Sequence, residues 1–410
     1  MPHRKATPDK HAFVMVGLPA RGKSYIARKL ARYLRWLGHD TRVFNVGSYR
    51  RELVGAQKPS EFFSPDNPEG AAARLKVAEV ALEDMIGWFE RGLAIGIYDA
   101  TNSTRERRAF LRSRLEAKGI EVIFVETICG DPAVVDRNVR ETKLHSPDYA
   151  GIPPERAVDD FLQRIAHYER AYETVTDDEG AYVKLIDEGD KLVAYRIDGA
   201  IPARAVFFIM NLQTRTRTVW LTRHGESVYN VEDRVGGDSE LSPRGVAYAR
   251  SLAAFMESRR ESAESDIAVW TSQLRRTIQT GSYLPESATS WRALDEIDAG
   301  VCDGMTYTEI RRSYPYDFAA RAEDKLGYRY PRGESYADLI QRLEPIIIEV
   351  ERCNTPIFIV GHQAVLRALY AYLMDSPPAE CPFLPMPLHT VIELVPNAYG
   401  CTERRYELTC

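Results

Sequence analysis

The sequence predicts an α/β protein built from two doubly wound domains. Short apolar runs alternate with helical stretches, which is typical of parallel strands that are buried on both faces. One run, Ala12–Val16, leads into a glycine-rich loop, and two others, Val219–Leu221 and Ile357–Val360, run on toward a histidine. A chain of 410 residues is also too long for one ordinary core. We therefore expect one domain over residues 1–213 and another over 218–410, joined at Gln213–Arg217.

The composition indicates a globular protein, with 28% charged and 44% hydrophobic residues. A net charge of -5 argues against a general nucleic-acid binder. No apolar run approaches the roughly 20 residues of a membrane span, and the N-terminal residues do not form a secretory signal. The 6 cysteines form no CxxC pair. We therefore expect neither a zinc site nor a disulfide framework, and a reducing, cytoplasmic location.

The first loop is a complete GxxxxGK[ST] pattern between a strand and a helix. Its glycines let backbone N–H groups surround phosphate oxygens, and the N-terminus of the helix adds partial positive charge. Lys23 is expected to reach the β- and γ-phosphates, and the hydroxyl of Ser24 to ligate Mg²⁺. The pattern comprises Gly17, Leu18, Pro19, Ala20, Arg21, Gly22, Lys23 and Ser24.

Three more strands and a closing strand are expected in this half. Asp99 ends the third strand, at the edge where α/β sheets place their chemistry. It is expected to coordinate Mg²⁺ or to accept the proton of an attacking hydroxyl, and the alternative is a helix N-cap. Cys129, at the end of the fourth strand, is more typical of a small buried apolar residue than of a nucleophile. The expected strands are Thr41–Val46, Leu93–Asp99, Val122–Cys129 and Val206–Met210, and a helix is expected over residues 154–174.

The second half places histidines and arginines after its strands. Arg223 and His224 end one strand, His362 ends another, and Arg276 follows a third. This pattern predicts a nucleophilic histidine held among phosphate-binding cations. An acid is needed to protonate a poor leaving group, but the sequence alone does not rank Asp295, Glu296 and Asp298.

The first half resembles the kinase half of the 6-phosphofructo-2-kinase/fructose-2,6-bisphosphatase family. The motifs that carry the resemblance are Gly17–Ser24, Phe44–Arg51, Glu61–Asn67, Asp99–Arg108 and Ser146–Tyr149. It implies a P-loop kinase-like sheet that binds ATP with Mg²⁺, with Asp99 and Cys129 at the reacting centre. It also implies that Tyr25, Asn138 and Lys143 contact ATP. Fructose 6-phosphate would be held by Arg50, Arg74, Thr101, Arg107, Lys143, Arg164 and Tyr168.

The second half resembles the bisphosphatase half of the same family, a histidine-phosphatase (phosphoglycerate-mutase-like) sheet. The matching stretches are Arg223–Ser227, Gly236–Ser239, Trp270–Ser272, Glu296–Cys302, Arg329–Tyr336 and His362–Val365. The resemblance implies that His224 takes the phosphoryl group from C2 of fructose 2,6-bisphosphate and that water hydrolyses the phosphohistidine. Arg223, Arg276 and His362 would hold the phosphoryl oxygens, and Glu296 would protonate the leaving oxygen. Substrate or neighbouring ligand positions are Asn230, Gly236, Tyr307, Arg321, Lys325, Arg329, Tyr336, Gln363 and Arg367.

The sequence departs from the family at one place: Leu326–Gly327 stands where relatives carry a Tyr-Arg pair. The expected function is nevertheless a bifunctional enzyme that makes and breaks fructose 2,6-bisphosphate, as a homodimer, with no nucleic-acid or membrane partner. One alternative keeps the fold with one inactive half. Another is a kinase–phosphatase fusion that acts on polynucleotide ends, which the negative net charge disfavours.

Overall fold

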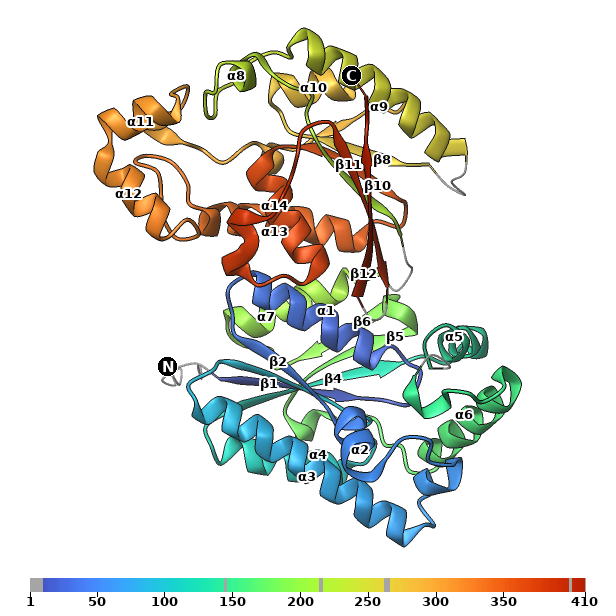
Figure 1. Ribbon diagram of the computed structural model, residues 1–410. Helices are drawn as coiled ribbons and strands as arrows, with labels where there is room; N and C mark the ends of the chain where they lie inside the picture. Colours follow the sequence, from blue (N-terminus) through green and yellow to red (C-terminus); the bar gives the residue numbers. More distant parts are fainter. Residues whose placement is uncertain (1–9, 144–145, 214–216, 262–265, 398–399, 410) are drawn as a thin grey trace. The chain divides into compact units, whose positions relative to one another are not determined.

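The chain forms two compact units, Met1–Thr214 and Arg215–Cys410. The computed structural model describes residues 10–143, 146–213, 217–261, 266–397 and 400–409. Within these residues each unit contains one six-stranded sheet flanked by helices, which confirms the predicted α/β class (Figure 1). Residues 214–216 of the expected linker lie outside the described residues.

The sheet of the first unit has the strand order β2-β3-β1-β4-β5-β6. All neighbouring strands are parallel except the last pair, which is antiparallel. The strands are β1 (His11–Val16), β2 (Thr41–Asn45), β3 (Ile95–Asp99), β4 (Glu121–Ile128), β5 (Ala181–Ile186) and β6 (Lys191–Tyr195). The helices are α1 (Lys23–Trp36), α2 (Val46–Val54), α3 (Pro68–Glu90), α4 (Arg105–Glu116), α5 (Pro132–Asn138), α6 (Pro154–Glu169) and α7 (Ala200–Met210), and a π-helix spans Val139–Lys143.

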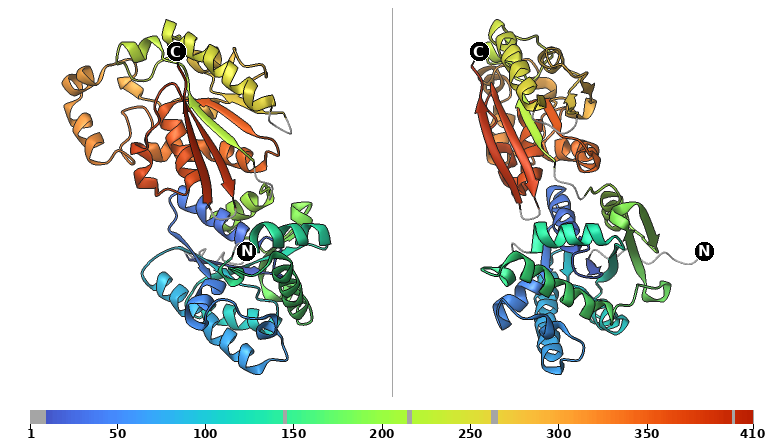
Figure 2. Two further views of the ribbon diagram at one scale, coloured as in Figure 1. Left: turned by 45° about the vertical axis from the view of Figure 1, so that its right-hand side comes forward. Right: turned by 90° about the vertical axis from the view of Figure 1, so that its right-hand side faces the viewer.

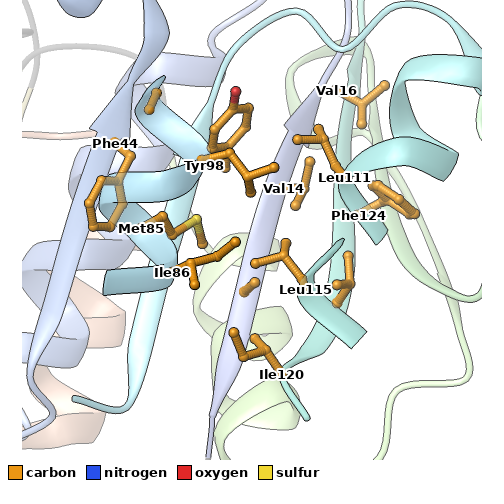
Figure 3. Close-up of a cluster of buried hydrophobic side chains, with 14 of the residues drawn as sticks. Val14, Val16, Phe44, Met85, Ile86, Tyr98, Leu111, Leu115, Ile120 and Phe124 are labelled. Carbon is orange, nitrogen blue, oxygen red and sulfur yellow. The ribbon is translucent and has the colours of Figure 1, made fainter. Parts of the chain in front are cut away.

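Helices cover both faces of this sheet. In Figure 1, α1 and α7 lie over one face, and α3 and α4 lie over the other. Every residue of β1 is buried as a result. Figure 3 shows the core on the α3–α4 side, where Met85 and Leu111 meet strand residues such as Val14 and Phe124. This packing fixes the carboxyl ends of β1, β3 and β4, on which the first site is built.

Two expectations about this unit need correction, and two of its strands were not expected. The strand expected at Val206–Met210 is wrong, because these residues belong to α7. The buried residues of α7 recur with a helical spacing, at Pro202, Ala205, Phe208 and Ile209. An apolar run this short does not separate strand from helix by itself. The helix expected over residues 154–174 ends at Glu169. The strands β5 and β6, which follow β4 toward one edge of the sheet, were not predicted.

The sheet of the second unit has the order β12-β11-β7-β10-β8-β9. Its strands are β7 (Val219–Arg223), β8 (Ala268–Thr271), β9 (Thr289–Ser290), β10 (Ile357–Gly361), β11 (Thr390–Asn397) and β12 (Gly400–Glu407). Its helices are α8 (Val228–Val231), α9 (Pro243–Glu261), α10 (Arg275–Gly281), α11 (Tyr307–Ser313), α12 (Pro315–Glu323), α13 (Tyr336–Arg352) and α14 (Gln363–Met374).

The centre of this sheet is parallel, and one edge is antiparallel. β7, β10, β8 and β9 are parallel neighbours, whereas β11 and β12 pair antiparallel. Figure 2 shows β11 and β12, in red, beside the yellow-green β7. The core on one face joins Tyr248 and Leu252 of α9 to Trp220 and Phe358 of the strands. Among the described residues, no helix is long and apolar enough to cross a membrane.

Candidate functional sites

The glycine loop joins β1 to α1 and lies on the end of β4. Gly17 has φ +132°, and a Cβ there would come within 2.4 Å of the carbonyl oxygen of Thr127. Gly22, with φ 82°, is the N-cap of α1, which starts at Lys23. Nζ of Lys23 donates to the carbonyl oxygen of Leu18 at 2.5 Å, so the lysine folds back over the loop. This is a cradle of backbone groups at a helix N-terminus, which suits phosphate oxygens.

The rest of the predicted loop is held by residues from later in the chain. Asn138 donates to the carbonyl oxygen of Ala20 at 3.1 Å. Arg21 donates to the carbonyl oxygen of Cys129 at 2.8 Å, so Cys129 reaches the loop through its backbone. Tyr25 donates from its hydroxyl to the carbonyl oxygen of Gln213 at 2.9 Å. Asn138 and Cys129 are thus brought to the loop, and Tyr25 is tied to the end of the unit.

Asp99 is buried at the carboxyl end of β3, beside the same loop. The side-chain amide of Asn45 donates to its carboxylate, across the β2–β3 pair. Two residues further on, the carbonyl oxygen of Thr101 accepts from the backbone N–H of Gly17 at 2.9 Å. The N-cap alternative for Asp99 is wrong, because Thr104 caps α4 by accepting from the N–H of Arg107. Asp99 therefore remains available to a ligand on the loop.

Arginines from α2 and α6 converge on one buried carboxylate, Asp148. Arg50 donates to both of its oxygens, at 2.7 and 2.6 Å, and an Nη atom of Arg164 lies 3.9 Å away. Burial alone would raise the pKa of Asp148, but the hydrogen bond and charge of Arg50 lower it below its ordinary value. The guanidinium of Arg164 also lies 3.6 Å from the ring centroid of Phe63.

The other predicted sugar-phosphate residues surround this group. Arg74, on α3, donates to the carbonyl oxygen of Phe62, and the ring of Tyr168 lies 6.2 Å from that of Phe63. Arg107 donates to the hydroxyl of Tyr98 at 3.3 Å. Helices α2, α3 and α6 thus supply arginines around Asp148 and the Phe62–Phe63 pair, and α4 supplies Arg107 beside Tyr98. Lys143 ends the π-helix, and its side chain lies outside the described part of the structure.

In the second unit, two strand ends bring two histidines together. β7 and β10 are parallel neighbours, with Arg223 opposite Gly361. The backbone N–H of His224 donates to the carbonyl oxygen of Gly361 at 3.0 Å. The ring centroids of His224 and His362 consequently lie 5.2 Å apart. The carboxyl edge of the sheet is where this topology places chemistry.

The tautomer of His224 follows from its partners. Nδ1 lies 2.7 Å from the carbonyl oxygen of Gly225, which can only accept, so Nδ1 carries the proton. Nε2 therefore has a lone pair, and Nε of Arg276 donates to it at 3.1 Å. Burial, followed by the charges of Arg276 and Arg223, lowers the pKa of His224 well below its ordinary value. His224 is thus a neutral imidazole whose reactive nitrogen lies beside a cation.

Arg223 and Glu296 complete the centre. Burial lowers the pKa of Arg223 to about 10, against the charge of Glu296, which raises it. Glu296 accepts from the backbone N–H of Ile297 at 2.9 Å and from that of Ala364 at 3.2 Å. Its neighbours are occupied elsewhere: Asp295 accepts from the N–H of Gln273, and Asp298 from that of Gly300. The structure therefore distinguishes Glu296, which lies beside the residues that follow His362, from Asp295 and Asp298, which bind other loops.

Further predicted positions form a basic patch beyond this centre. Arg367 donates to the hydroxyl of Tyr336 at 3.2 Å. Lys325 donates to the carbonyl oxygen of Pro382 at 3.0 Å. Burial, then the charges of Arg367 and Arg321, lowers the pKa of Lys325 to about 8. The guanidinium of Arg321 lies 5.6 Å from the ring centroid of Tyr307. These contacts link Tyr336, Arg367, Lys325, Arg321 and Tyr307 in one chain of neighbours.

The remaining predicted residues have mainly local contacts. The side-chain oxygen of Asn230 accepts from the N–H of Ser227, in a capping box at the start of α8. Gly236 has φ 68°, and a Cβ there would come within 1.8 Å of Oδ1 of Asp303. Gln363 is the first residue of α14. Arg329 is exposed and pairs with Asp338 at 2.5 Å, so the structure does not place it against the histidines.

The sequence interpretation gave no role to several residues that contact these sites. Ser272 bonds to His362 at 2.7 Å, and Asp148 and Phe63 organise the arginine cluster. Ser272 follows a strand, in the matched stretch Trp270–Ser272, and that position was the available signal. Nothing in the local sequence indicates that Asp148 would lie among arginines. Its partner Arg50, for example, is 98 positions away in the chain.

Comparisons with known proteins match both units. Residues 2–216 match the 6-phosphofructo-2-kinase family, and residues 219–409 match the histidine phosphatase superfamily (branch 1). The 6-phosphofructo-2-kinase/fructose-2,6-bisphosphatase of Arabidopsis thaliana is 51% identical over 98% of this chain, which spans only 54% of that protein's length. A human relative, 6-phosphofructo-2-kinase/fructose-2,6-bisphosphatase 4, is 46% identical over 98% of this chain and 88% of its own length. The 6-phosphofructo-2-kinase/fructose-2,6-bisphosphatase of Gallus gallus is 48% identical over 95% of this chain and 83% of its own length.

Proposed function

The chain belongs to the 6-phosphofructo-2-kinase/fructose-2,6-bisphosphatase family, and from this premise we propose that it both makes and hydrolyses fructose 2,6-bisphosphate. Residues 1–213 carry the ATP-dependent synthesis, and residues 218–410 carry the hydrolysis. The observation that carries the proposal is the state of His224. Its Nδ1 is bound to the carbonyl oxygen of Gly225 at 2.7 Å, so its Nε2 carries the lone pair, to which Nε of Arg276 donates at 3.1 Å.

In the kinase unit, ATP lies on the loop Gly17–Ser24, with Lys23 at its β- and γ-phosphates. Arg21, Tyr25, Asn138 and Lys143 support the nucleotide. The hydroxyl of Ser24 and the carboxylate of Asp99 are hard oxygen ligands, so they suit Mg²⁺. When bound, Mg²⁺ supplies charge stabilisation for phosphoryl transfer. Support for Asp99 comes from its burial at the end of β3 and from the amide of Asn45, which orients it.

Fructose 6-phosphate occupies the arginine cluster of the same unit. Arg50 and Arg164 converge on Asp148, so their guanidinium groups are already oriented when the substrate arrives. Planar arginine forks bind phosphate in two places. The enzyme gains rate mainly by positioning and by charge stabilisation, because phosphoryl transfer has little covalent work for side chains. The remaining contacts come from Arg74, Thr101, Arg107, Lys143 and Tyr168, and Cys129 lies beside the loop.

In the hydrolase unit, Nε2 of His224 attacks the phosphorus at C2. A P–N bond forms, the P–O bond to C2 breaks, and Glu296 delivers a proton to the leaving oxygen. Arg223, Arg276 and His362 bind the phosphoryl oxygens as charge develops on them. Water then attacks the phosphorus and returns a proton to Glu296, the P–N bond breaks, inorganic phosphate leaves, and His224 is restored. The side chains of the chain and one water molecule supply every group in this cycle.

The 6-phosphate and the sugar lie over the basic patch around Lys325. The buried or half-buried cations Arg367, Lys325 and Arg321 offer the charge that a second phosphate needs. Their separation from His224 lets one end of the substrate be held while the other reacts. The ligand residues here are Asn230, Gly236, Tyr307, Arg321, Lys325, Arg329, Tyr336, Gln363 and Arg367.

Membership of the family is also the ground for a proposal about the partners and the location of the protein. We propose a cytoplasmic homodimer without a nucleic-acid partner. The net charge of -5 supports the absence of a nucleic-acid partner. Sedimentation analysis of the full chain tests the homodimer, since a monomer at micromolar concentration would contradict it.

A labelling experiment tests the proposed function. The protein is incubated with ATP labelled in the γ-phosphate and with fructose 6-phosphate. We expect an acid-labile labelled sugar bisphosphate, followed by label on the protein at His224 and then labelled inorganic phosphate. Transfer of label from ATP to His224 without fructose 6-phosphate, or hydrolysis with no label on His224, would overturn the proposed sequence.

A further inference from the structure

His362 is fully buried, and its two ring nitrogens have different surroundings. Nε2 lies 2.7 Å from the hydroxyl oxygen of Ser272. Nδ1 is buried, and the described residues offer it no hydrogen-bond partner. A neutral imidazole carries one proton, so one nitrogen donates and the other accepts. The position of this proton decides whether an entering phosphoryl oxygen meets an N–H group or a lone pair at Nδ1.

The hydroxyl of Ser272 belongs to a short chain of hydroxyl groups. It accepts from the backbone N–H of Leu274 at 3.1 Å and lies 2.7 Å from the hydroxyl of Thr277. The carbonyl oxygen of Leu274 lies 2.8 Å from the Thr277 hydroxyl, but it already accepts two backbone N–H groups, from Thr277 and Ile278. The Thr277 hydroxyl also lies 3.2 Å from the carbonyl oxygen of Ser272. Its nearest acceptor is the Ser272 hydroxyl at 2.7 Å, so Thr277 can donate to Ser272. Ser272 then has its own proton available for Nε2 of His362.

Charges around His362 keep the ring neutral. Burial lowers its pKa well below the ordinary value, and the neighbouring cations and the second histidine lower it further. A neutral ring with its proton on Nε2 would bond to Ser272 and would turn a lone pair toward an anion. The groups that lower the pKa are Arg276 of α10, His224 after β7, Arg223 of β7 and Arg342 of α13. The carboxylate of Glu296 accepts from the backbone N–H of Ala364, two residues after His362.

We propose that Ser272 is a positioning residue of the hydrolase, which donates to Nε2 of His362 and so holds the ring proton on Nδ1, toward the phosphoryl oxygen. The proposal rests on the hydrolase function proposed above. It gives the two neutral histidines opposite roles. His224 keeps its proton on Nδ1 through Gly225 and attacks with Nε2, whereas His362 donates from Nδ1 and is held through Nε2.

The tautomer can be measured directly in the full-length protein. The chain is labelled with ¹⁵N-histidine, and ring-nitrogen shifts are recorded by long-range ¹H–¹⁵N correlation, with and without inorganic phosphate. A His362→Gln variant assigns the signal. We expect the phosphate-bound protein to show a protonated Nδ1 and an unprotonated Nε2 at His362. A proton on Nε2 in the phosphate-bound protein overturns the proposal.

The Ser272→Ala variant supplies a kinetic test. Its kcat/KM for hydrolysis should fall about tenfold at neutral pH, which is the effect of one buried hydrogen bond. Because the ring of His362 stays neutral, this loss should not change with pH, and without phosphate the ¹⁵N spectrum of the variant should show part of the ring proton on Nε2. A loss that is purely structural would leave the proton on Nδ1. A kcat/KM within twofold of wild type contradicts the proposal.

The matched control is Ser282→Ala, which removes an exposed hydroxyl at the C-terminal end of α10, the helix that follows Ser272. It should leave hydrolysis unchanged. If Ser272→Ala does not fold, the wild-type tautomer decides the matter. The two proposals can fail separately. If the wild-type protein hydrolyses fructose 2,6-bisphosphate but has the His362 proton on Nε2, only the proposed role of Ser272 is wrong. If the proton is on Nδ1 but the protein does not hydrolyse the substrate, the proposed function is wrong and the proposed tautomer is right.

Discussion

Single residues in the second site owe their chemistry to burial. His224 is 4% exposed, and its lowered pKa keeps the imidazole neutral well into the acidic range. Arg223 remains a cation at neutral pH, even though burial lowers its pKa to about 10. The pair therefore combines a neutral nucleophile with a nearby positive charge, which is what attack on a phosphate anion requires.

Lys325 gives a pH-dependent prediction at the residue scale. Its pKa is lowered to about 8 by burial and neighbouring cations. Below this pH the ammonium group is charged and attracts the second phosphate, and above it the charge is lost. We therefore expect kcat/KM for hydrolysis to fall as the pH rises through about 8. Because kcat/KM reports ionisations of the free enzyme, steady-state kinetics across this range measures the effect.

Lys325→Arg is the control for this prediction. An arginine keeps its charge throughout the range, so the fall in kcat/KM near pH 8 should disappear in the variant. An identical alkaline limb in the wild-type and Lys325→Arg proteins would assign the ionisation to another group and remove Lys325 from the account.

At the scale of elements, the ends of strands could be predicted, and their surroundings could not. The apolar runs that end at Asp99, His224 and His362 predicted strands whose carboxyl ends carry the chemistry, and the structure has β3, β7 and β10 there. Strand order could not be predicted, because pairing such as Arg223 opposite Gly361 joins residues far apart in the sequence. The antiparallel strands β11 and β12 were not predicted, and α7 was mistaken for a strand.

The candidate site follows the same division. Residues inside continuous motifs, such as Lys23 and His224, could be identified because local order is the signal. Ser272 and Asp148 act through side-chain contacts across 90 and 98 positions, which no local pattern records. Arg329 was identified by its match to a family ligand position, but in the structure its side chain is exposed and pairs with Asp338.

A close approach of α9 to the histidine loop gives the prediction at this scale. A Cβ on Gly245 would come within 2.1 Å of the carbonyl oxygen of Glu226, and backbone cannot move aside cheaply. Gly245→Ala should therefore destabilise the second unit by about 3 kcal/mol, as overpacking does, and reduce hydrolysis. Thermal inactivation of the hydrolase, with synthesis assayed on the same samples, measures this.

Gly87→Ala is the matched control, because Gly87 also lies within a helix. Its nearest neighbour to an added Cβ is the end of the Arg91 side chain, 3.8 Å away. Alanine at that position should be neutral or stabilising by up to about 1 kcal/mol, since it favours helix more than glycine does. Equal effects of the two substitutions would mean that helix propensity, rather than the approach to Glu226, explains the result.

At the scale of the whole molecule, the two units rely on different chemistry. In the proposed function, Ser24 and Asp99 of the first unit are oxygen ligands for a divalent ion, whereas histidines and arginines of the second unit bind phosphoryl oxygens directly. A chelator of divalent ions should therefore abolish ATP-dependent synthesis and leave hydrolysis within about twofold of its starting rate. Parallel assays before and after treatment, with Mg²⁺ added back, check both halves. Loss of hydrolysis that Mg²⁺ restores would contradict the mechanism proposed for the second unit.

The central claim is that one chain carries two independent phosphoryl sites, one at Lys23 and one at His224. Full-length His224→Ala and Lys23→Ala proteins, each assayed for synthesis and for hydrolysis of fructose 2,6-bisphosphate, test it most directly. We expect His224→Ala to lose hydrolysis and keep synthesis, and Lys23→Ala to do the reverse. If either substitution abolishes both activities in a folded protein, the two-site account is wrong.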